Sequence, residues 1–199
     1  VVEPGEFIFA SAFLDHGHIH GQTNGLKDAG GTLKWVFDPD SKRVADFVEK
    51  HPGVQVAESY EEILNDEEVK LVCAAAVPSE RAAIGIQAMK AGKDYFTDKS
   101  PFTTLEQLEE ARAVAAETGQ KYMVYYSERL HNEAGMKAQE LINNGAVGRV
   151  LQVVNLAPHR LSKSIRPDWF FDKEKYVGGG LVAHMDEDVK AAIAEHGIR

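Results

Sequence analysis

The chain has 199 residues, of which 44% are hydrophobic and 27% charged, and its formal net charge is −9 at pH 7. Because this acidic balance comes without a strong basic cluster, it excludes a broad electrostatic surface for nucleic acids or anionic membranes. The single cysteine, Cys73, excludes an internal disulfide and a cysteine-rich zinc module, and its apolar neighbours predict a small buried side chain. The sequence contains no apolar run of about 18 residues and shows no signal peptide at its start, so we expect a cytoplasmic protein.

Short apolar runs alternate with helical patterns along the first two thirds of the chain. The runs predict strands at residues 7–13, 32–38, 54–57, 69–77, 94–98 and 121–127. Helices are predicted between them, at residues 21–30, 41–51, 59–66, 78–93 and 103–119. Ser41 is predicted to cap the second helix, and Thr103 with Glu106 forms a capping-box pattern at the last one. The alternation predicts an α/β fold with a doubly wound, Rossmann-like parallel sheet.

The architecture changes near residue 127. A long helical pattern at 128–145 precedes an apolar strand pattern at 149–157, an irregular aromatic and basic stretch, and an amphipathic helix at 186–199. This order predicts the beginning of a second, α+β domain. We therefore expect a dinucleotide-binding domain at residues 1–127 and a partial substrate or dimerisation domain at 128–199.

The turn after the first predicted strand is the expected place for a cofactor pyrophosphate. Ligands bind beyond the carboxyl ends of the strands in such sheets, where helix N-termini offer backbone amides. The usual G-x-G-x-x-G pattern is missing here, and only small residues fill its first places. Asp15 is predicted to cap the following helix. The imidazoles of His16 and His18 are predicted to offset its charge or to donate to the phosphates, and Gly17 is predicted to permit close approach of the phosphates. The candidate cofactor contacts of this turn are Ser11, Leu14, His16, Gly17 and His18.

Asp38 is the candidate ribose ligand. It ends the second predicted strand, 21 residues after Gly17, where a carboxylate would accept hydrogen bonds from the ribose hydroxyls. Such a carboxylate repels a 2′-phosphate and so favours NAD, although the nearby Lys42 and Arg43 keep NADP open. The alternative is that Asp38 only caps the turn between strand and helix.

The stretch 91–130 resembles the Gfo/Idh/MocA oxidoreductases. In that family the fifth strand ends in an E-K-P motif, followed by a threonine-capped helix and a strand that leads to an N-x-R-F-like segment. Here Asp98, Lys99 and Pro101 stand for the first motif, with Ser100 inserted, and residues 127–129 stand for the second. The resemblance spans roughly residues 6–180, and the L-D-H-G-H turn at 14–18 matches a branch that lacks the glycine pattern.

This resemblance implies hydride transfer between NAD or NADP, with NAD favoured, and a sugar, inositol or related polyol. The family's lysine lies beside the nicotinamide and the reacting carbinol, which implies Lys99 as a catalytic residue. The alternative for Lys99 is a surface lysine at a strand end. Further implied cofactor contacts are Val77, Pro78, Asp98 and Lys99. Glu80 and Arg81 lie near the family's cofactor contacts too, and a salt bridge at a helix start explains them equally well.

The sequence departs from the family pattern toward its end. The family's G-G-x-x-x-D-x-x-x-H segment has an altered counterpart in which His184 comes early and the spacing from aspartate to histidine is lost. His184 remains the second catalytic candidate. We expect weak or absent turnover from a chain with this altered segment.

Basic and aromatic residues form the candidate substrate site. Arginine and tryptophan bind hydroxylated or anionic ligands well, although a loop packed on the sheet explains the same composition. The candidates are Arg129, His159, Arg160, Arg166 and Trp169.

Two other function classes compete with the oxidoreductase. A metal-dependent hydrolase would use His16, His18 and His20, which share one face only if the segment is a strand. Gly17 and Gly21 favour a turn and a helix start, and no later lone His or Asp stands convincingly at each strand end. The sequence therefore assigns no metal site. The second class is a non-catalytic dinucleotide-binding or oligomerisation protein. For partners we expect a small molecule and a homo-oligomer, with no nucleic acid and no membrane.

Overall fold

The computed structural model describes residues 2–3, 5–127, 131–152, 166–172 and 174–176. The chain divides into two compact units, Val1–Tyr125 with Pro167–His184, and Tyr126–Arg166 with Met185–Arg199. None of the helices in the described ranges combines the length and apolar character that a membrane crossing requires.

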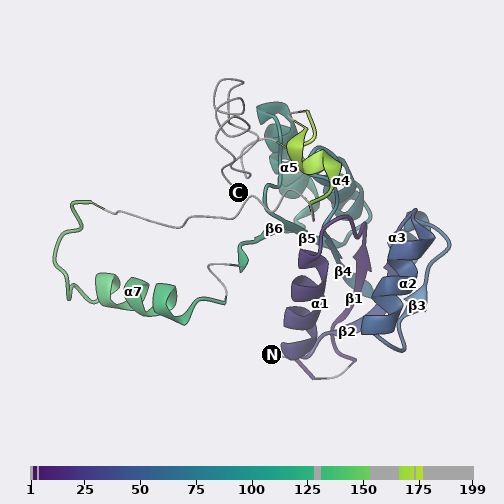
Figure 1. Ribbon diagram of the computed structural model, residues 1–199, viewed down its shortest axis with the longest axis horizontal. Coiled ribbons are helices and arrows are strands. Elements are labelled where there is room, and N and C mark those ends of the chain that lie inside the picture. The colour runs from purple at the N-terminus through teal and green to yellow at the C-terminus, as the bar shows by residue number, and fades with distance from the viewer. Residues whose placement is uncertain (1, 4, 128–130, 153–165, 173, 177–199) are drawn as a thin grey trace, which may run out of the picture. The chain divides into compact units, whose positions relative to one another are not determined.

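The first unit is built on one parallel sheet of six strands, in the order β3-β2-β1-β4-β5-β6 (Figure 1). The strands are β1 (Ile8–Ala12), β2 (Thr32–Phe37), β3 (Gln55–Val56), β4 (Val69–Ala74), β5 (Asp94–Asp98) and β6 (Tyr122–Tyr125). The strand order reverses at β1, which pairs with β2 on one side and β4 on the other. This confirms the doubly wound, Rossmann-like sheet, and it places the switch point at the turn after β1.

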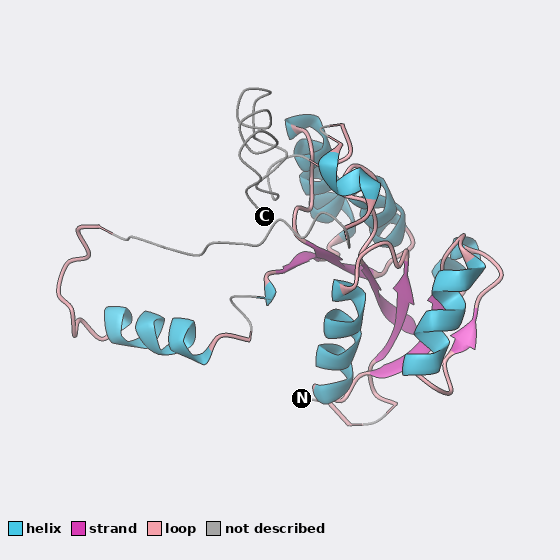
Figure 2. Ribbon diagram, in the orientation of Figure 1, coloured by secondary structure: helices cyan, strands magenta, loops and turns pink. Residues whose placement is uncertain are grey.

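Helices cover both faces of the sheet (Figure 2). They are α1 (His18–Asp28), α2 (Ser41–Lys50), α3 (Tyr60–Asn65), α4 (Arg81–Lys90) and α5 (Leu105–Thr118). Successive residues of β1 point to opposite faces, so Phe9 packs with Ile19 of α1 and Phe47 of α2, while Ala10 joins the core that contains Ile63 and Ile84. A third cluster joins α4 to α5.

The predicted caps of α2 and α5 are each wrong by one residue. The cap of α2 is Asp40, whose side chain accepts a hydrogen bond from the amide of Lys42, and not Ser41, which is already helical. The cap of α5 is Thr104 instead of Thr103, and Gln107 takes the part expected of Glu106. Both errors have the same cause: neighbouring residues carry equivalent oxygens, and only the local backbone selects between them.

The start of α1 differs more. The helix begins at His18, three residues before the predicted Gly21, and its N-cap is Gly17. Asp15 was predicted as this cap, which is wrong because the chain still forms a turn there and the carboxylate of Asp15 pairs with Arg43. Gly21 is helical, and a Cβ on it would lie 2.6 Å from the hydroxyl oxygen of Tyr125. A glycine at position 21 therefore serves close packing of α1, not the start of the helix.

In the second unit, the described part of the predicted helix 128–145 is α7 (Glu133–Asn143), capped by Asn132. Residues 149–152 of the predicted strand 149–157 are not in a strand, and the rest of that prediction lies outside the described residues. So does the predicted helix at 186–199. The aromatic stretch contains a short 3-10 helix, η2 (Asp168–Phe171), which belongs to the first unit. The domain boundary at residue 127 stays a prediction.

Candidate functional site

The turn after β1 is held between its two neighbouring strands. The amide of Phe13 donates to the carbonyl of Phe37, the last residue of β2. The amide of Ala75 donates to the carbonyl of Phe13 and the amide of His16 to the carbonyl of Ala75, which joins the turn to the end of β4, each at 3.0 Å. Phe13 has a φ of 53°, a left-handed conformation that costs a side-chain-bearing residue roughly 1–2 kcal/mol. Edge-to-face contacts of its ring with Phe37 and Tyr60 offset that strain. The left-handed turn expected of a glycine is thus made by a phenylalanine.

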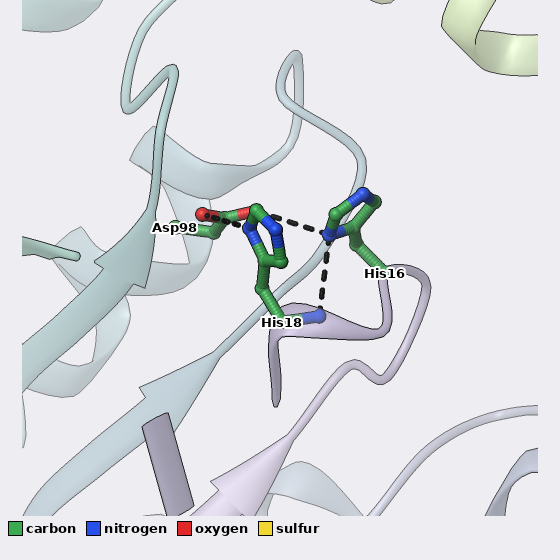
Figure 3. A group of neighbouring side chains, drawn as sticks. All are labelled: His16, His18 and Asp98. Carbon is green, nitrogen blue, oxygen red and sulfur yellow. Dashed lines mark hydrogen bonds and ion pairs between the residues drawn. The ribbon is translucent and has the colours of Figure 1, made fainter. Parts of the chain in front are cut away.

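Beyond this turn, His16 and His18 converge on Asp98, the last residue of β5 (Figure 3). Nδ1 of His18 lies 2.9 Å from Oδ1 of Asp98, and Nδ1 of His16 lies 3.3 Å from Oδ2. The two imidazole rings are in edge-to-face contact, with centroids 4.2 Å apart. The Asp98 side chain is 2% exposed, whereas those of His16 and His18 are 20% and 35% exposed. The cluster is therefore buried on its carboxylate side and open on its imidazole side.

Asp98 is held as a carboxylate despite its burial. Burial alone raises the pKa of this group, but the hydrogen bonds from His16 and His18 and the charge of Arg81 outweigh it, so the pKa lies well below its usual range. The amide of Lys99 also donates to Oδ1, at 2.8 Å. A negative charge is thus fixed at the carboxyl end of β5.

Arg81, at the start of α4, is the cationic partner of this carboxylate. Its side chain is 1% exposed and lies 3.5 Å from Oδ2 of Asp98. Its Nε donates to the carbonyl of Ala76, and its Nη1 donates to the carbonyl of Ser100. The guanidinium therefore ties together the ends of β4 and β5 instead of reaching solvent. No spacing in the sequence pointed to this pairing.

His20 takes a different direction from its two neighbours. Its Nδ1 lies 3.0 Å from Nε2 of His51, and both rings pack on Phe47 on the face covered by α1 and α2. Burial is the main cause of a lowered pKa for both imidazoles, to about 4 for His51. The triplet considered for a hydrolase is thus divided into two sites by the start of α1.

Asp38, the predicted ribose ligand, supports the first turn. Its fully covered carboxylate accepts hydrogen bonds from the amides of Leu14, at 2.6 Å, and Asp40, at 2.8 Å. Arg43 lies 3.3 Å from Asp38 and 2.7 Å from Asp15, and 40% of its side chain is exposed. Asp15 is largely removed from water, which raises its pKa, although Arg43 opposes this. At the end of β2, the Arg43 guanidinium is therefore partly exposed to solvent, and the carboxylates of Asp15 and Asp38 lie beneath it.

The remaining predicted cofactor contacts lie around the same edge of the sheet. Ser11 is fully buried, and its hydroxyl contacts Thr23 at 2.9 Å and the thiol of Cys73 at 3.2 Å. Cys73 is buried as expected, which raises its pKa to about 11. Val77 and Pro78 are buried in the loop after β4, and Lys99 directly follows β5.

Among the predicted substrate residues, Trp169 lies in the first unit, where its ring centroid is 6.1 Å from that of His16. The amide of Ser79 donates to the carbonyl of Lys175 and so fixes this aromatic segment beside the loop after β4. Arg166 belongs to the second unit. Outside the described residues lie Arg129, His159, Arg160 and His184.

Comparisons with known proteins identify relatives of this chain. Residues 9–126 match a family described as "Oxidoreductase family, NAD-binding Rossmann fold", GFO_IDH_MocA. The chain is 28% identical over 175 residues to the D-xylose dehydrogenase of Paenarthrobacter nicotinovorans, covering 80% of this chain and 44% of that protein.

Solved structures of oxidoreductases have a similar fold. A protein from Erwinia carotovora atroseptica SCRI1043, described as an oxidoreductase, is 40% identical with a TM-score of 0.83, over 87% of this chain and 52% of that chain. The myo-inositol 2-dehydrogenase of Lactobacillus plantarum shares the fold, at 18% identity and a TM-score of 0.63, over 74% of this chain and 43% of that chain. The chain thus spans about half the length of these relatives.

Proposed function

Because the chain belongs to the Gfo/Idh/MocA oxidoreductase family, we propose that it binds a nicotinamide dinucleotide at the carboxyl ends of β1, β4 and β5. In this proposal residues 1–127 hold the dinucleotide and residues 128–199 contribute to a substrate site. The reaction is hydride transfer to or from a sugar, inositol or related polyol, and the bound nicotinamide supplies the hydride chemistry.

The observation that carries the proposal is the start of α1 at the switch point. Gly17 precedes the helix, no acidic residue lies in its first turn, and a Cβ built on Gly17 would meet nothing within 4 Å. A helix N-terminus with free space above a glycine favours the close approach of a phosphate. The partly exposed imidazoles of His16 and His18 flank this space and add donors for an anion. The turn therefore fits a pyrophosphate without the usual three glycines.

Lys99 is proposed as the residue that holds or moves the proton of the reacting carbinol oxygen. It follows Asp98 directly, and the amide of Lys99 is anchored on that carboxylate, which fixes the backbone from which the side chain extends. A positioned ammonium polarises a carbonyl oxygen or assists the loss of a hydroxyl proton. His184 is proposed as the second catalytic residue on the family pattern alone.

The substrate class is proposed from two sources. The printed names of the relatives are those of a D-xylose and a myo-inositol dehydrogenase, both polyhydroxylated substrates. In this chain the ring of Trp169 lies beside His16 at the edge of the same site, where an aromatic face favours the apolar side of a sugar ring. Arg129, His159, Arg160 and Arg166 stay predicted contributors to that site.

The preferred nicotinamide is proposed to be NAD. Asp38 and Asp15 lie behind Arg43 and offset its charge, so the end of β2 offers no unopposed cation for a 2′-phosphate.

Fluorescence titration of the full chain with NADH and NADPH tests this proposal. We expect saturable binding of both, tighter for NADH, and a homo-oligomer by light scattering. Failure of both nucleotides to bind would contradict the proposed function. Tighter binding of NADPH would overturn the NAD preference alone.

A further inference from the structure

The cluster of His16, His18 and Asp98 has a geometry that a dinucleotide site does not require. These three residues each offer one ligand atom, and the three atoms lie within 4.8 Å of one another. Four-coordinate zinc with bonds of about 2.0–2.1 Å separates its ligand atoms by roughly 3.3 Å. The distances from Asp98 to the two Nδ1 atoms, 2.9 and 3.3 Å, are already close to that separation.

Both imidazoles present Nδ1 to the same carboxylate. Nδ1 of His16 lies 3.3 Å from Oδ2 of Asp98, and Nδ1 of His18 lies 2.9 Å from Oδ1. An imidazole nitrogen offers either a lone pair or a proton in the ring plane, never both. When the ring protons are on the Nε2 atoms, both Nδ1 lone pairs are available beside the carboxylate, as metal binding requires.

We propose that His16, His18 and Asp98 bind one divalent transition-metal ion, Zn²⁺, through the two Nδ1 atoms and the carboxylate. Two imidazoles and one carboxylate form a donor set that zinc accepts, and three protein ligands leave one position for water or another ligand. Entry is from the imidazole side, where the two histidine side chains are 20% and 35% exposed.

The buried surroundings of Asp98 suit the carboxylate of such a site. Metal-binding carboxylates are oriented by hydrogen bonds from neighbouring groups, and here Arg81 and the amide of Lys99 hold Asp98 in place. The charge of Arg81 also repels a second cation, so the affinity for Zn²⁺ is expected to be lower than that of a site with only neutral groups around it. Asp98 is the residue that the sequence argument against a metal site did not include, and it replaces His20 as the third ligand.

The first test measures zinc binding by the full chain after treatment with a chelator and dialysis. Calorimetric titration is expected to show one Zn²⁺ per chain, and titration with Co²⁺ is expected to give visible d–d absorption of a low-symmetry site. Absence of stoichiometric binding of either ion would overturn the proposal.

The second test assigns the ligands with matched histidine variants. His16→Ala and His18→Ala are each expected to weaken Zn²⁺ binding at least tenfold. His20→Ala removes the next histidine along the chain, which contacts His51, and is expected to leave the Zn²⁺ affinity unchanged. Thermal unfolding without metal shows whether each variant folds, and added Zn²⁺ is expected to raise the Tm of wild type and His20→Ala only. Equal losses in all three variants would place the ion elsewhere.

The zinc site shares His16 and His18 with the proposed dinucleotide site, and the two proposals are tested by separate measurements. NADH titration in the presence of a chelator reads dinucleotide binding alone, and Zn²⁺ titration without nucleotide reads the metal alone. Each result therefore supports or contradicts its own proposal.

Discussion

His18 and His20 are two residues apart in the sequence but belong to two different imidazole clusters, and the charges around these clusters differ. His16 and His18 face a buried carboxylate that Arg81 holds in place, whereas His20 faces a second imidazole, Phe47 and the ammonium of Lys50. The first cluster gathers the Arg81 guanidinium and two imidazoles around one anion, whereas the contacts of His20 within the described part of the chain include no carboxylate. The start of α1 separates them, because it directs His18 toward β5 and His20 toward α2. The chemistry of a histidine here depends on which element it faces, and not on its place in an H-x-H-x-H pattern.

Among the variants that test this difference between the two clusters, Arg81→Met is expected to lower the free energy of unfolding most. The variant keeps much of the side-chain volume but removes the cation beside Asp98 and the donors to the carbonyls of Ala76 and Ser100. Breaking a buried ion pair costs about 3–5 kcal/mol, so we expect the free energy of unfolding in urea to fall by about 3 kcal/mol.

Arg112→Met is the matched control for Arg81. Arg112 is exposed and pairs with Glu109 one helical turn away, so the expected loss is below about 0.5 kcal/mol. Similar losses in both variants would show that Arg81 does not organise the site.

A smaller loss of stability is expected when acid protonates His20 and His51 of the second cluster. The pKa of His51 is lowered to about 4 and that of His20 is lowered too, both mainly by burial, so in the unfolded chain these groups bind protons at a higher pH. Their contribution to stability is therefore complete above pH 6.5 and is lost as the pH falls toward 4.

Urea unfolding at pH 7 and pH 5 measures this loss. After allowance for screening by solvent, we expect the wild type to lose on the order of 1–2 kcal/mol more over this interval than His51→Gln. Equal pH dependence of the two proteins would contradict the assignment of the loss to the second cluster.

The sequence predicted the fold well and the site less completely. The alternation of buried strands with capped helices sufficed for the sheet and its parallel order, because each strand and helix carries its own pattern. Asp38, Asp98 and the histidine turn were predicted at the carboxyl ends of their strands, since the topology alone brings those ends to one edge. Whether they contact a cofactor is a separate prediction.

The pairing of Arg81 with Asp98 was not predictable, because it depends on two loops whose paths are fixed by tertiary packing. The same holds for His20, which belongs to one H-x-H-x-H pattern with His16 and His18 but turns toward His51. At Phe13 the sequence motif led to too weak a prediction, because the glycine usual in this turn is missing. The contacts of the Phe13 ring with Phe37 and Tyr60 nevertheless allow this residue to adopt the left-handed conformation.

The central claim, that a dinucleotide phosphate occupies the space above the turn after β1, is tested most directly by comparing Gly17→Ala with Gly25→Ala. A Cβ meets nothing within 4 Å at either position, so both variants are expected to fold, and Gly25→Ala in α1 gains up to about 1 kcal/mol of stability. In fluorescence titrations with NADH, Gly17→Ala is expected to bind at least tenfold more weakly than wild type, a difference of about 1.4 kcal/mol, and Gly25→Ala to bind as wild type does. Unchanged NADH affinity in Gly17→Ala would contradict the claim.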